Sequence, residues 1–556
     1  MAAREGSEIL DLLMPIFSGH KDAYGKDVAP PLPLSFDRTS YGDHWRDPST
    51  RTADFPCPDF LGQPRFFRQL ARSRQFASVQ FDYSDISLDL VEKLVVEGRE
   101  RAANGGTLQS RSIGPCIRRI TVATNPGWIS HRHGVELRTI NDLEETEQNK
   151  RMMDASTAFF GGYMARLQGL LPVLPHLELL DWEDMIALPP SFYDSIACSH
   201  IKHLKLFRVS VGDGFQLGQP NARGSGAWPL RTLHLELRPS LERLSDFSTL
   251  VLCASILRSC APTLEALTWN AVHHYRNEPS IAAIEAVDTV PRFTAIRSLK
   301  IGDVGLATLS LLDSLVQDGL RELDVDTEAS PLEFLTANPQ LSKLAIPNAA
   351  PKQLLDTSLL PLLVSSFTTL TSLSLVWEGL AISERALEMI SFLRALEQIH
   401  LSAGNQYGWR HDWLIDHEIM RKYLGRLPSL KRIAFSRDSY NFNGINPSLV
   451  ESYYEDKVVL SGNPRMLVQH LVATGQPART VSDLETGHVR LWELTHLEKI
   501  TSEAILYMDA VKKLEWVYMG QLPIQCVRGP KNSILPAAER DSCWTLLRNM
   551  FGGRTV

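Results

Sequence analysis

The chain has few cysteines, little excess of either charge and no long hydrophobic run. Its 556 residues include seven cysteines, none of which forms a C-x-x-C pair. A secreted disulfide scaffold is denser in cysteine and a zinc ribbon needs such pairs, so both classes are excluded. The net charge of −7 arises from 57 basic and 64 acidic residues. A nucleic-acid-binding chain usually carries a basic excess, and we therefore expect no nucleic-acid partner.

The sequence also lacks an apolar stretch long enough for a membrane-spanning helix. The longest apolar stretches, such as Leu359–Val364, are far shorter than the ~20 residues that a membrane-spanning helix needs. Residues 1–17 contain acidic side chains and lack the apolar core of a signal peptide. We therefore expect no membrane partner and a cytoplasmic or nuclear location.

No motif for catalysis, cofactor binding or metal binding is present. Gly19–Asp27 resembles a phosphate-binding loop, but five residues separate its glycines and Asp27 occupies the place of the magnesium-binding Ser or Thr. His131 and His133, like His273 and His274, lack further ligands at metal-binding spacing. We predict a protein that is not an enzyme, with no catalytic residue, cofactor or metal.

What the sequence does contain is a repeat of the form apolar-x-x-apolar-x-apolar, at intervals of 21 to 34 residues. The ten clear copies are Leu177/Leu180/Trp182, Ile201/Leu204/Leu206, Leu230/Leu233/Leu235, Leu264/Leu267/Trp269, Ile296/Leu299/Ile301, Leu320/Leu323/Val325, Leu341/Leu344/Ile346, Leu370/Leu373/Leu375, Leu396/Ile399/Leu401 and Leu430/Ile433/Phe435. Weaker copies lie at Phe76/Val79/Phe81, Ile117/Ile120/Val122 and Val511/Leu514/Trp516.

The repeat predicts a short strand followed by a helix. The last two apolar positions are two residues apart and therefore share one face of a strand. Residues 305–319 and 381–393 have apolar side chains at helical spacing. Ser330–Glu333 is a capping box with proline at the first helical position, and Asn338-Pro339 should end that helix.

Stacked strand–helix units bury a continuous core that one unit cannot bury alone. We therefore predict an α/β solenoid of about 10–13 irregular units. Its repeat resembles that of leucine-rich-repeat proteins, and this resemblance implies a leucine-rich-repeat solenoid with a curved parallel sheet and helices on the convex side. The alternative is an ordinary α/β domain with buried parallel strands. Such a domain would more often show β-branched runs and glycine-rich turns, which are scarce here.

On these repeats, the chain resembles fungal F-box-like leucine-rich-repeat proteins. The strings that carry the resemblance are Leu174–Trp182, Phe367–Leu375 and Leu427–Phe435. The asparagine or cysteine usual eight positions after the first leucine is missing, as at Glu328 and Glu378. The resemblance implies a protein-interaction module and, in F-box proteins, contact with a Skp-type adaptor of a cullin ubiquitin ligase.

The F-box itself is degenerate or missing. Glu8–Phe17 fits its first amphipathic helix, and Trp45-Arg46 fits its closing Trp-Arg pair. The prolines of residues 29–34 forbid the expected middle helix. Residues 8–46 are the candidate contact with a Skp-type adaptor.

Side chains that alternate with the buried leucines should line the concave face and bind a protein there. Their signs are mixed, which suits a protein partner better than a polyanion. These side chains are His203, Lys205, His234, Lys300, Glu322, Asp324, Lys343, His400 and Arg432.

Two late loops are rich in aromatic residues. Tyr, Trp and Arg are the side chains enriched in binding hot spots. The candidate partner-binding residues are Tyr407, Trp409, Arg410, Trp413, Tyr440 and Phe442. The alternative is that these aromatic side chains fold down as a cap on the last repeats.

The chain should comprise three parts. Residues 1–62 form an N-terminal, partly disordered segment with the F-box-like motif, 63–436 the repeat array, and 437–556 irregular repeats and a cap. Two functions fit this organisation. The first is the substrate-recognition subunit of a Skp–cullin–F-box ubiquitin ligase, and the alternative is an adaptor or scaffold with no link to a ligase.

Overall fold

The computed structural model describes two compact units, which meet in sequence between Gly319 and Leu320. The described residues are 76–103, 112–135, 143–171, 174–184, 186, 188–211, 217, 228–239, 247–271, 292–302, 319–325, 331–404, 406–407, 410–411, 413, 415–435, 500–519, 522–529, 532–536, 547 and 550–551. The part up to Gly319 is called the first unit, and the part from Leu320 the second unit.

The described residues of the first unit form a sheet of seven parallel strands, each hydrogen-bonded to the next along the chain. In chain order they are β1 (Ser78–Phe81), β2 (Arg119–Val122), β3 (Leu179–Trp182), β4 (His203–Val211), β5 (Thr232–Pro239), β6 (Ala266–Ala271) and β7 (Ser298–Gly302).

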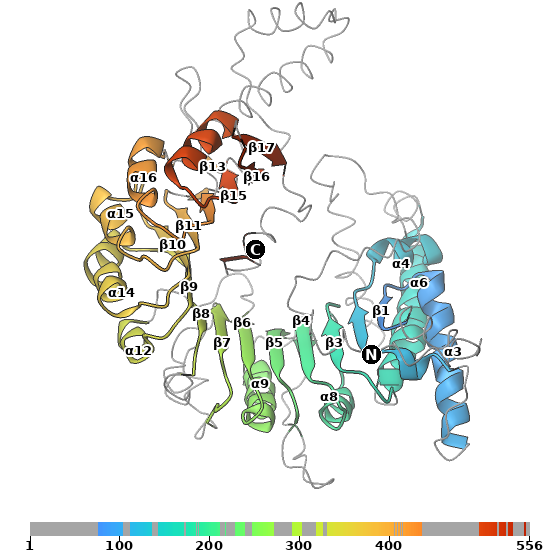
Figure 1. The fold of residues 1–556 in the computed structure, drawn as a ribbon. Helices are drawn as coiled ribbons and strands as arrows, with labels where there is room; N and C mark the ends of the chain where they lie inside the picture. The colour runs from blue at the N-terminus through green and yellow to red at the C-terminus, as the bar shows by residue number, and fades with distance from the viewer. Residues whose placement is uncertain are drawn as a thin grey trace, which may run out of the picture. The chain divides into compact units, whose positions relative to one another are not determined.

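Helices connect these strands (Figure 1). They are α3 (Asp85–Ala103), the short η4 (Gly114–Cys116), α4 (Pro126–His133), α6 (Glu145–Ser156), the π-helical η5 (Thr157–Met164), α7 (Ala165–Leu170), α8 (Pro190–Ala197) and α9 (Phe247–Cys260). Local chemistry sets the ends of α4: the Asn125 side chain accepts from the Gly127 N–H, and Gly134 adopts a left-handed conformation with φ of 62°.

In the second unit, the part of the chain that the structure describes forms a sheet of six parallel strands followed by two antiparallel ones. The parallel strands are β8 (Glu322–Val325), β9 (Lys343–Ala350), β10 (Ser372–Trp377), β11 (Gln398–Ser402), β14 (Arg432–Phe435) and β15 (Trp516–Met519). The antiparallel strands are β16 (Leu522–Val527) and β17 (Ser533–Pro536). A separate antiparallel pair is formed by β12 (Gln406–Tyr407) and β13 (Arg410–His411).

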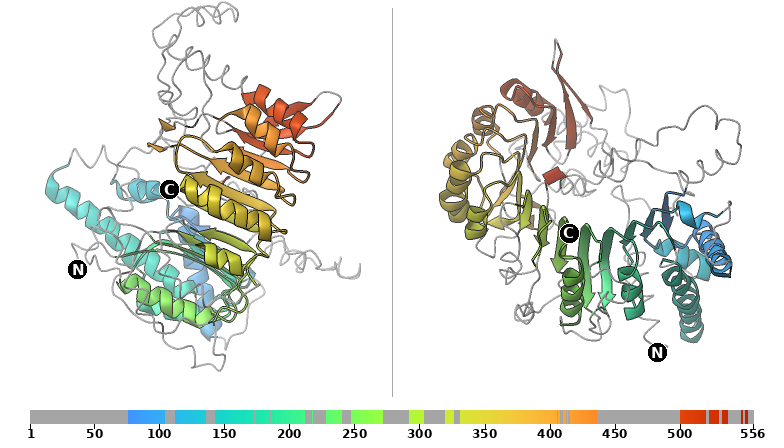
Figure 2. Two further views of the ribbon diagram at one scale, coloured as in Figure 1. Left: turned by 90° about the vertical axis from the view of Figure 1, so that its left-hand side faces the viewer. Right: turned by 60° about the horizontal axis from the view of Figure 1, so that its bottom comes forward.

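The helices of the second unit lie on one face of its sheet (Figure 2). They are α12 (Pro331–Ala337), α13 (Lys352–Leu354), η9 (Leu355–Leu359), α14 (Leu360–Ser366), α15 (Glu384–Ile390) and α16 (His417–Leu424), and residues 500–510 are also helical. The predicted helix start at Ser330-Pro331 is confirmed by α12, and the helix predicted within 381–393 is confirmed by α15. The helix predicted over 305–319 lies almost wholly outside the described residues.

The predicted repeat is confirmed in both units. All ten clear copies fall on a parallel strand, and the apolar positions of each copy are buried. In the copy at β10, for example, Leu370 just before the strand and Leu373 and Leu375 within it are each 0% exposed. The described residues hold seven parallel strands in the first unit and six in the second, within the range predicted for a leucine-rich-repeat architecture.

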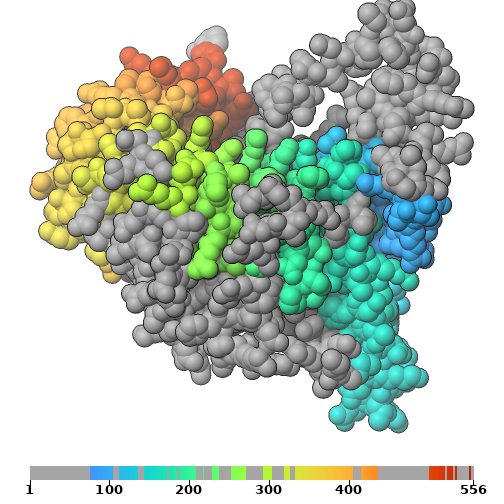
Figure 3. All heavy atoms as spheres, turned by 90° about the horizontal axis from the view of Figure 1, so that it is seen from below, coloured from blue at the N-terminus to red at the C-terminus, as the bar shows by residue number. Residues whose placement is uncertain are grey.

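Neighbouring repeats share a continuous core. The space-filling view shows the yellow and orange segments of the second unit packed directly against one another (Figure 3). Because adjacent strands pair in register, Leu373 of β10 stands beside Leu344 of β9 and Ile399 of β11. The apolar rows therefore run from strand to strand, as the stacking argument requires.

The register predicted for the last weak copy was wrong by three residues. Trp516 pairs with Arg432, so Leu514, Val517 and Met519 occupy the apolar positions instead of Val511, Leu514 and Trp516. All three are buried. Both triplets have the apolar spacing of the repeat. Val511 is buried at the end of the preceding helix, and its apolar side chain therefore matched the first position of a repeat.

The predicted three-part division has boundaries at residues 62 and 436, which lie outside the described residues. The boundary that the structure shows, at Gly319 and Leu320, falls inside the predicted repeat array.

Candidate binding surface

Each strand offers one set of side chains to the helices and the alternate set to the opposite face, here called the open face. This follows from the two-residue period of a strand. In β4, Leu204 and Leu206 are buried at 2% and 0%, whereas His203 and Lys205, which alternate with them, are half-buried. The open face is therefore the polar surface that the sequence predicts for binding.

Charged side chains gather on the open face of the first unit at strands β3 and β4. The Lys205 ammonium lies 2.5 Å from the Glu183 carboxylate and 3.3 Å from that of Asp181. It also lies 5.2 Å from the centre of the Phe207 ring. Because Asp181 pairs in register with Lys205 across the two strands, the backbone itself brings these charges together.

The next two strands extend this polar surface. Glu236 on β5 accepts a hydrogen bond from the Asn270 amide of β6 at 3.4 Å, and the His234 Nε2 atom lies 3.9 Å from the Glu236 carboxylate. His203 Nδ1 and the Thr232 hydroxyl are hydrogen-bonded at 2.9 Å. We call Asp181, Glu183, Lys205, His234 and Glu236 the β3–β5 patch.

Burial changes the acid–base behaviour of this patch. It raises the pKa of Asp181 to about 6, with Lys205 opposing the shift and Glu183 adding to it. For Lys205, burial lowers the pKa, but the two carboxylates outweigh it and the net shift is upward, so the side chain stays charged. Burial and the nearby Arg231 lower the pKa of His203 to about 4, which keeps that imidazole neutral at pH 7.

Sequence reasoning found part of this patch and missed the rest. The predicted residues Lys205, His203 and His234 lie on the open face and are partly exposed. The missed residues are Asp181 and Glu236, each 4% exposed, and Glu183, whose side chain is 35% exposed. The same alternation places them on this face, since Asp181 lies between Leu180 and Trp182 and Glu236 directly follows Leu235.

The predicted open-face residues of the second unit are more varied. Lys343 and Glu322 form an ion pair of 2.6 Å between β9 and β8. Asp324 and His400 are buried, at 7% and 8% exposure, whereas Arg432 is exposed. His400 Nδ1 is hydrogen-bonded to the Ser374 hydroxyl at 2.7 Å, and burial lowers the pKa of this imidazole to about 4.

The predicted aromatic loops are only partly described. The backbones of Tyr407 and Arg410 pair across β12 and β13, while Trp409, Tyr440 and Phe442 lie outside the described residues. Trp413 is 1% exposed and packs edge-on against Phe435, with 6.1 Å between ring centroids. The burial of Trp413 favours a role in packing at this position.

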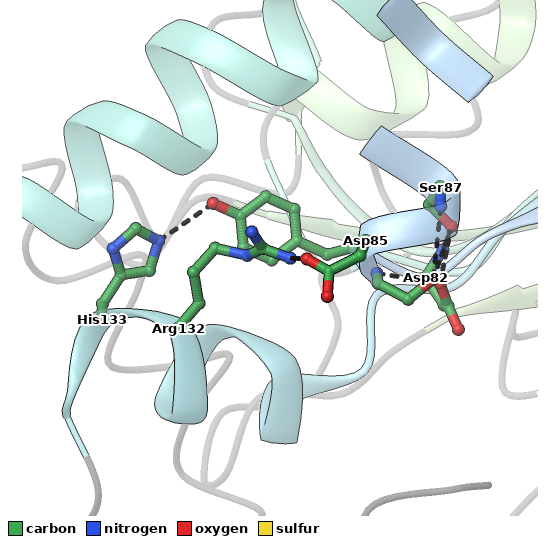
Figure 4. Close-up of polar contacts among 7 residues, drawn as sticks. Asp82, Asp85, Ser87, Arg132 and His133 are labelled. Atoms are coloured by element: carbon green, nitrogen blue, oxygen red, sulfur yellow. Dashed lines mark hydrogen bonds and ion pairs between the residues drawn. The ribbon is translucent and has the colours of Figure 1, made fainter. Parts of the chain in front are cut away.

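A second polar cluster joins the first strand to two helices of the first unit (Figure 4). The Ser87 hydroxyl donates to the Asp82 carboxylate at 2.6 Å, and Arg132 forms an ion pair of 2.5 Å with Asp85. Tyr83, which has an unusual φ of 69°, is hydrogen-bonded through its hydroxyl to His133 at 2.9 Å. These bonds link the end of β1 to the start of α3 and the end of α4.

We assign this cluster a structural role. Ser87 contacts a carboxylate directly, and the histidine of the cluster contacts a phenol instead of the serine, so the arrangement of a nucleophile, base and orienting acid is not formed there. The backbone conformation of Tyr83 costs of order 1–3 kcal/mol, which the surrounding bonds offset.

Two searches of the described residues complete the description of the site. Among those residues, no group of three or more His, Cys, Asp or Glu side chains is arranged to hold a metal ion. Within the same part of the chain, every helix is too short or too polar to cross a membrane.

Comparison with known proteins gives matches among solved structures. No protein-family model matches the chain, and no curated protein matches it. Among solved structures, the chain is similar to the leucine-rich repeat-containing protein LegL7 from Legionella pneumophila. The identity is 11% and the TM-score 0.29, over 66% of this chain and 94% of that one. The leucine-rich-repeat architecture of this chain therefore rests on its own strand register and buried repeat positions.

Proposed function

We propose that the chain is a protein-binding module whose first unit contacts a partner through the β3–β5 patch. The observation that carries the proposal is the placement of three carboxylates and one lysine on adjacent, hydrogen-bonded strands. Side chains on a regular sheet are held in place before binding, so less conformational entropy is lost when the partner docks.

The charges of the patch indicate the chemistry of the partner. Asp181, Glu183 and Glu236 place three carboxyl groups in the patch against the single ammonium group of Lys205. Glu183, Lys205 and His234 keep 35%, 31% and 26% of their side chains exposed. A partner segment that presents arginine or lysine beside an acceptor for Lys205 would match this surface, because interfaces pair opposite charges.

The test is charge reversal at the exposed edge of the patch. Glu183→Lys should reduce the recovery of specific partners after affinity purification and weaken binding of an identified partner by roughly tenfold or more. Glu92→Lys on α3 makes the same charge change on a side chain that is 71% exposed and lies off the sheet, and it serves as the matched control. Both variants should melt within a few degrees of the wild-type chain.

The proposal fails if Glu183→Lys and Glu92→Lys retain the same partners with the same affinities. It also fails if an identified partner protects only the helices from hydrogen exchange. In either case the partner would be using a surface other than the β3–β5 patch.

We propose as the finer function that the chain is the substrate-recognition subunit of a Skp–cullin–F-box ubiquitin ligase in the cytoplasm or nucleus. The support is the F-box-like sequence at Glu8–Phe17 and Trp45-Arg46, in residues 8–46, which lie outside the described residues. The alternative is an adaptor or scaffold that uses the same repeats without a ligase.

Co-purification distinguishes these two functions. Full-length chain and a variant lacking residues 1–62 are each incubated with purified Skp-type adaptor. Retention by the full chain alone supports the ligase function. Failure of both to retain the adaptor, while partner binding through the β3–β5 patch is intact, supports the scaffold function.

A further inference from the structure

The open face of the second unit is covered at strands β11, β14 and β15. Ala434, Trp516 and Tyr518 point to this face, because they alternate with the apolar repeat positions, yet they are only 0%, 6% and 2% exposed. On the open face of β9, two strands away from β11, Lys343 by contrast retains 41% of its side-chain exposure. Something must therefore lie over the sheet at its later strands.

The C-terminal part of the chain itself provides that cover. Leu547 and Phe551, at 6% and 4% exposure, form one buried apolar cluster with Ala434, Trp516 and Tyr518, and Met550 packs against it. The Phe551 ring lies 5.6 Å from His400 and 6.5 Å from Trp516, measured between ring centroids.

A backbone contact fixes the same segment to the sheet. The Gln398 amide on β11 donates to the Met550 carbonyl at 2.8 Å and to the Ser372 hydroxyl at 2.7 Å. Residues 547, 550 and 551 are helical, and positions i, i+3 and i+4 of a helix share one face. The segment, here called the C-terminal turn, thus lays one apolar helical face on the open face of the sheet.

The contact leaves one polar group unsatisfied. The Trp516 indole N–H is buried and has no acceptor among the described residues. A buried donor without an acceptor weakens the contact that buries it. A competing segment that supplied an acceptor at this point would bind the same surface more favourably.

We propose that the open face of β11, β14 and β15 is a docking site for an amphipathic helix of a partner protein, and that the C-terminal turn occupies this site until the partner displaces it. The partner helix carries apolar side chains at i, i+3 and i+4, as Leu547, Met550 and Phe551 do. This inference rests on the proposed protein-binding function and adds a second contact with its own regulation.

Tethering explains why the site is closed in the free chain. A segment joined covalently to its site competes at an effective concentration that is commonly millimolar. The apparent affinity for an external helix falls in proportion to the fraction of molecules whose site is open. Weakening the C-terminal turn should therefore strengthen external binding without adding any contact.

The experiment uses a fluorescent peptide of residues 541–556 with Cys543→Ser as the external helix. Its binding is measured by anisotropy to the full chain and to the full-length double variant Leu547→Ser/Phe551→Ser. We expect the double variant to bind the peptide roughly tenfold or more tightly than the wild-type chain does. A peptide in which the leucine, methionine and phenylalanine positions are shuffled should not bind.

The docking surface has its own variant and control. Ala434→Glu, added to the double variant, places a charge in the buried cluster and should abolish the gain in affinity. Thr268→Glu makes a similar change on the open face of β6 in the first unit and should leave the gain intact. The proposal is overturned if the double variant binds no more tightly than the wild-type chain, or if Ala434→Glu has no effect.

Hydrogen exchange on the unmodified chain keeps the proposal testable if the double variant does not fold. Saturating peptide should accelerate exchange of the chain's own amides at 547–551, and no acceleration would overturn the proposal. Glu183→Lys should not alter peptide binding, so failure here and failure of the β3–β5 patch are separate outcomes.

Discussion

At the scale of single residues, hydrogen bonds from a neighbouring turn hold a carboxyl group that is buried in the repeat array. Asp184, the second residue after β3, is 3% exposed and accepts hydrogen bonds from the Thr124 N–H at 2.5 Å and the Thr124 hydroxyl at 2.6 Å. Burial raises the pKa of Asp184 to about 6, although both hydrogen bonds oppose the shift. The residue therefore links the turns after two adjacent strands while resisting ionisation.

The pH dependence of stability should reveal Asp184. A carboxyl whose pKa is about 6 when folded and 3.8 when unfolded stabilises the folded chain fully below pH 3.8 and loses that contribution as the pH rises through 6. The free energy of unfolding of the wild-type chain should therefore fall with rising pH, relative to Asp184→Asn, by up to about 1.4 kcal/mol per pH unit over this window. Urea unfolding at pH 4, 5, 6 and 7 measures the difference.

The same titrations need one control, because Asp181 has a pKa raised in the same direction. Asp181→Asn should remove the contribution of Asp181 to the pH dependence of the free energy of unfolding and leave the contribution of Asp184. A pH profile of Asp184→Asn that is parallel to that of the wild-type chain would contradict the assignment of a raised pKa to this carboxyl.

At the scale of elements, the strands were predictable because their signal is local. Leu373 and Leu375 share a strand face by spacing alone, and Leu370 marks the entry to that strand. The start of α12 at Pro331 was predictable from the capping box with proline at the first helical position, and α15 was predictable from apolar side chains at helical spacing. The Val511 triplet misled because its apolar side chains end a helix and begin a strand with the spacing of a repeat.

The surface was less predictable because it depends on contacts distant in sequence. Alternation places Lys205 on the open face, but the exposure of an open-face residue depends on what covers it. Gln398 contacts Met550, 152 residues away, and no spacing rule connects the two. His400 was predicted as a surface residue for this reason, whereas the structure buries it beside Phe551.

Two variants in the aromatic loop between β11 and α16 distinguish a role in partner binding from a role in packing. We propose that Trp409, with Tyr407, Arg410, Tyr440 and Phe442, contacts a partner, while Trp413 packs against Phe435. Trp413→Ala should lower the free energy of unfolding by ~3–5 kcal/mol, as expected for a buried large aromatic side chain. Trp409→Ala should leave the melting temperature nearly unchanged and weaken partner binding by about 2 kcal/mol or more.

Thermal melts and partner titrations on both variants decide between the two roles. Equal losses of melting temperature in Trp409→Ala and Trp413→Ala, with partner affinity retained below the transition, would assign the whole loop to the cap. The matched side chains, four residues apart, make the comparison direct.

At the scale of the whole molecule, the two units are built on the same strand-and-helix plan, and neither brings together a metal-binding cluster among the described residues. Because the cysteine and histidine residues lack metal-binding spacing in the sequence, we predict that elemental analysis of the purified full-length chain finds no stoichiometric zinc or iron. The thiols of Cys253, Cys260 and Cys526 are buried, and burial raises the pKa of each to about 12, which disfavours the thiolate that binds metal. One tightly held equivalent of metal would contradict this prediction.

A repeat array also predicts how far the destabilisation by one core substitution extends along the chain. Leu373 is 0% exposed and stands in register with Leu344 and Ile399 on the two flanking strands. Leu373→Ala should lower the free energy of unfolding by ~2–5 kcal/mol, whereas Leu380→Ala, at a side chain that is 57% exposed, should change it little.

Because each repeat is stabilised mainly by its neighbours, the amides of β9 and β11 should exchange faster in Leu373→Ala, and those of β2 and β3 in the first unit should be unchanged. Hydrogen exchange followed by mass spectrometry resolves these strands. Uniform acceleration of exchange across both units would mean that the chain unfolds as one cooperative body. Unchanged exchange of the β10 amides would mean that Leu373 does not stabilise the stacked core.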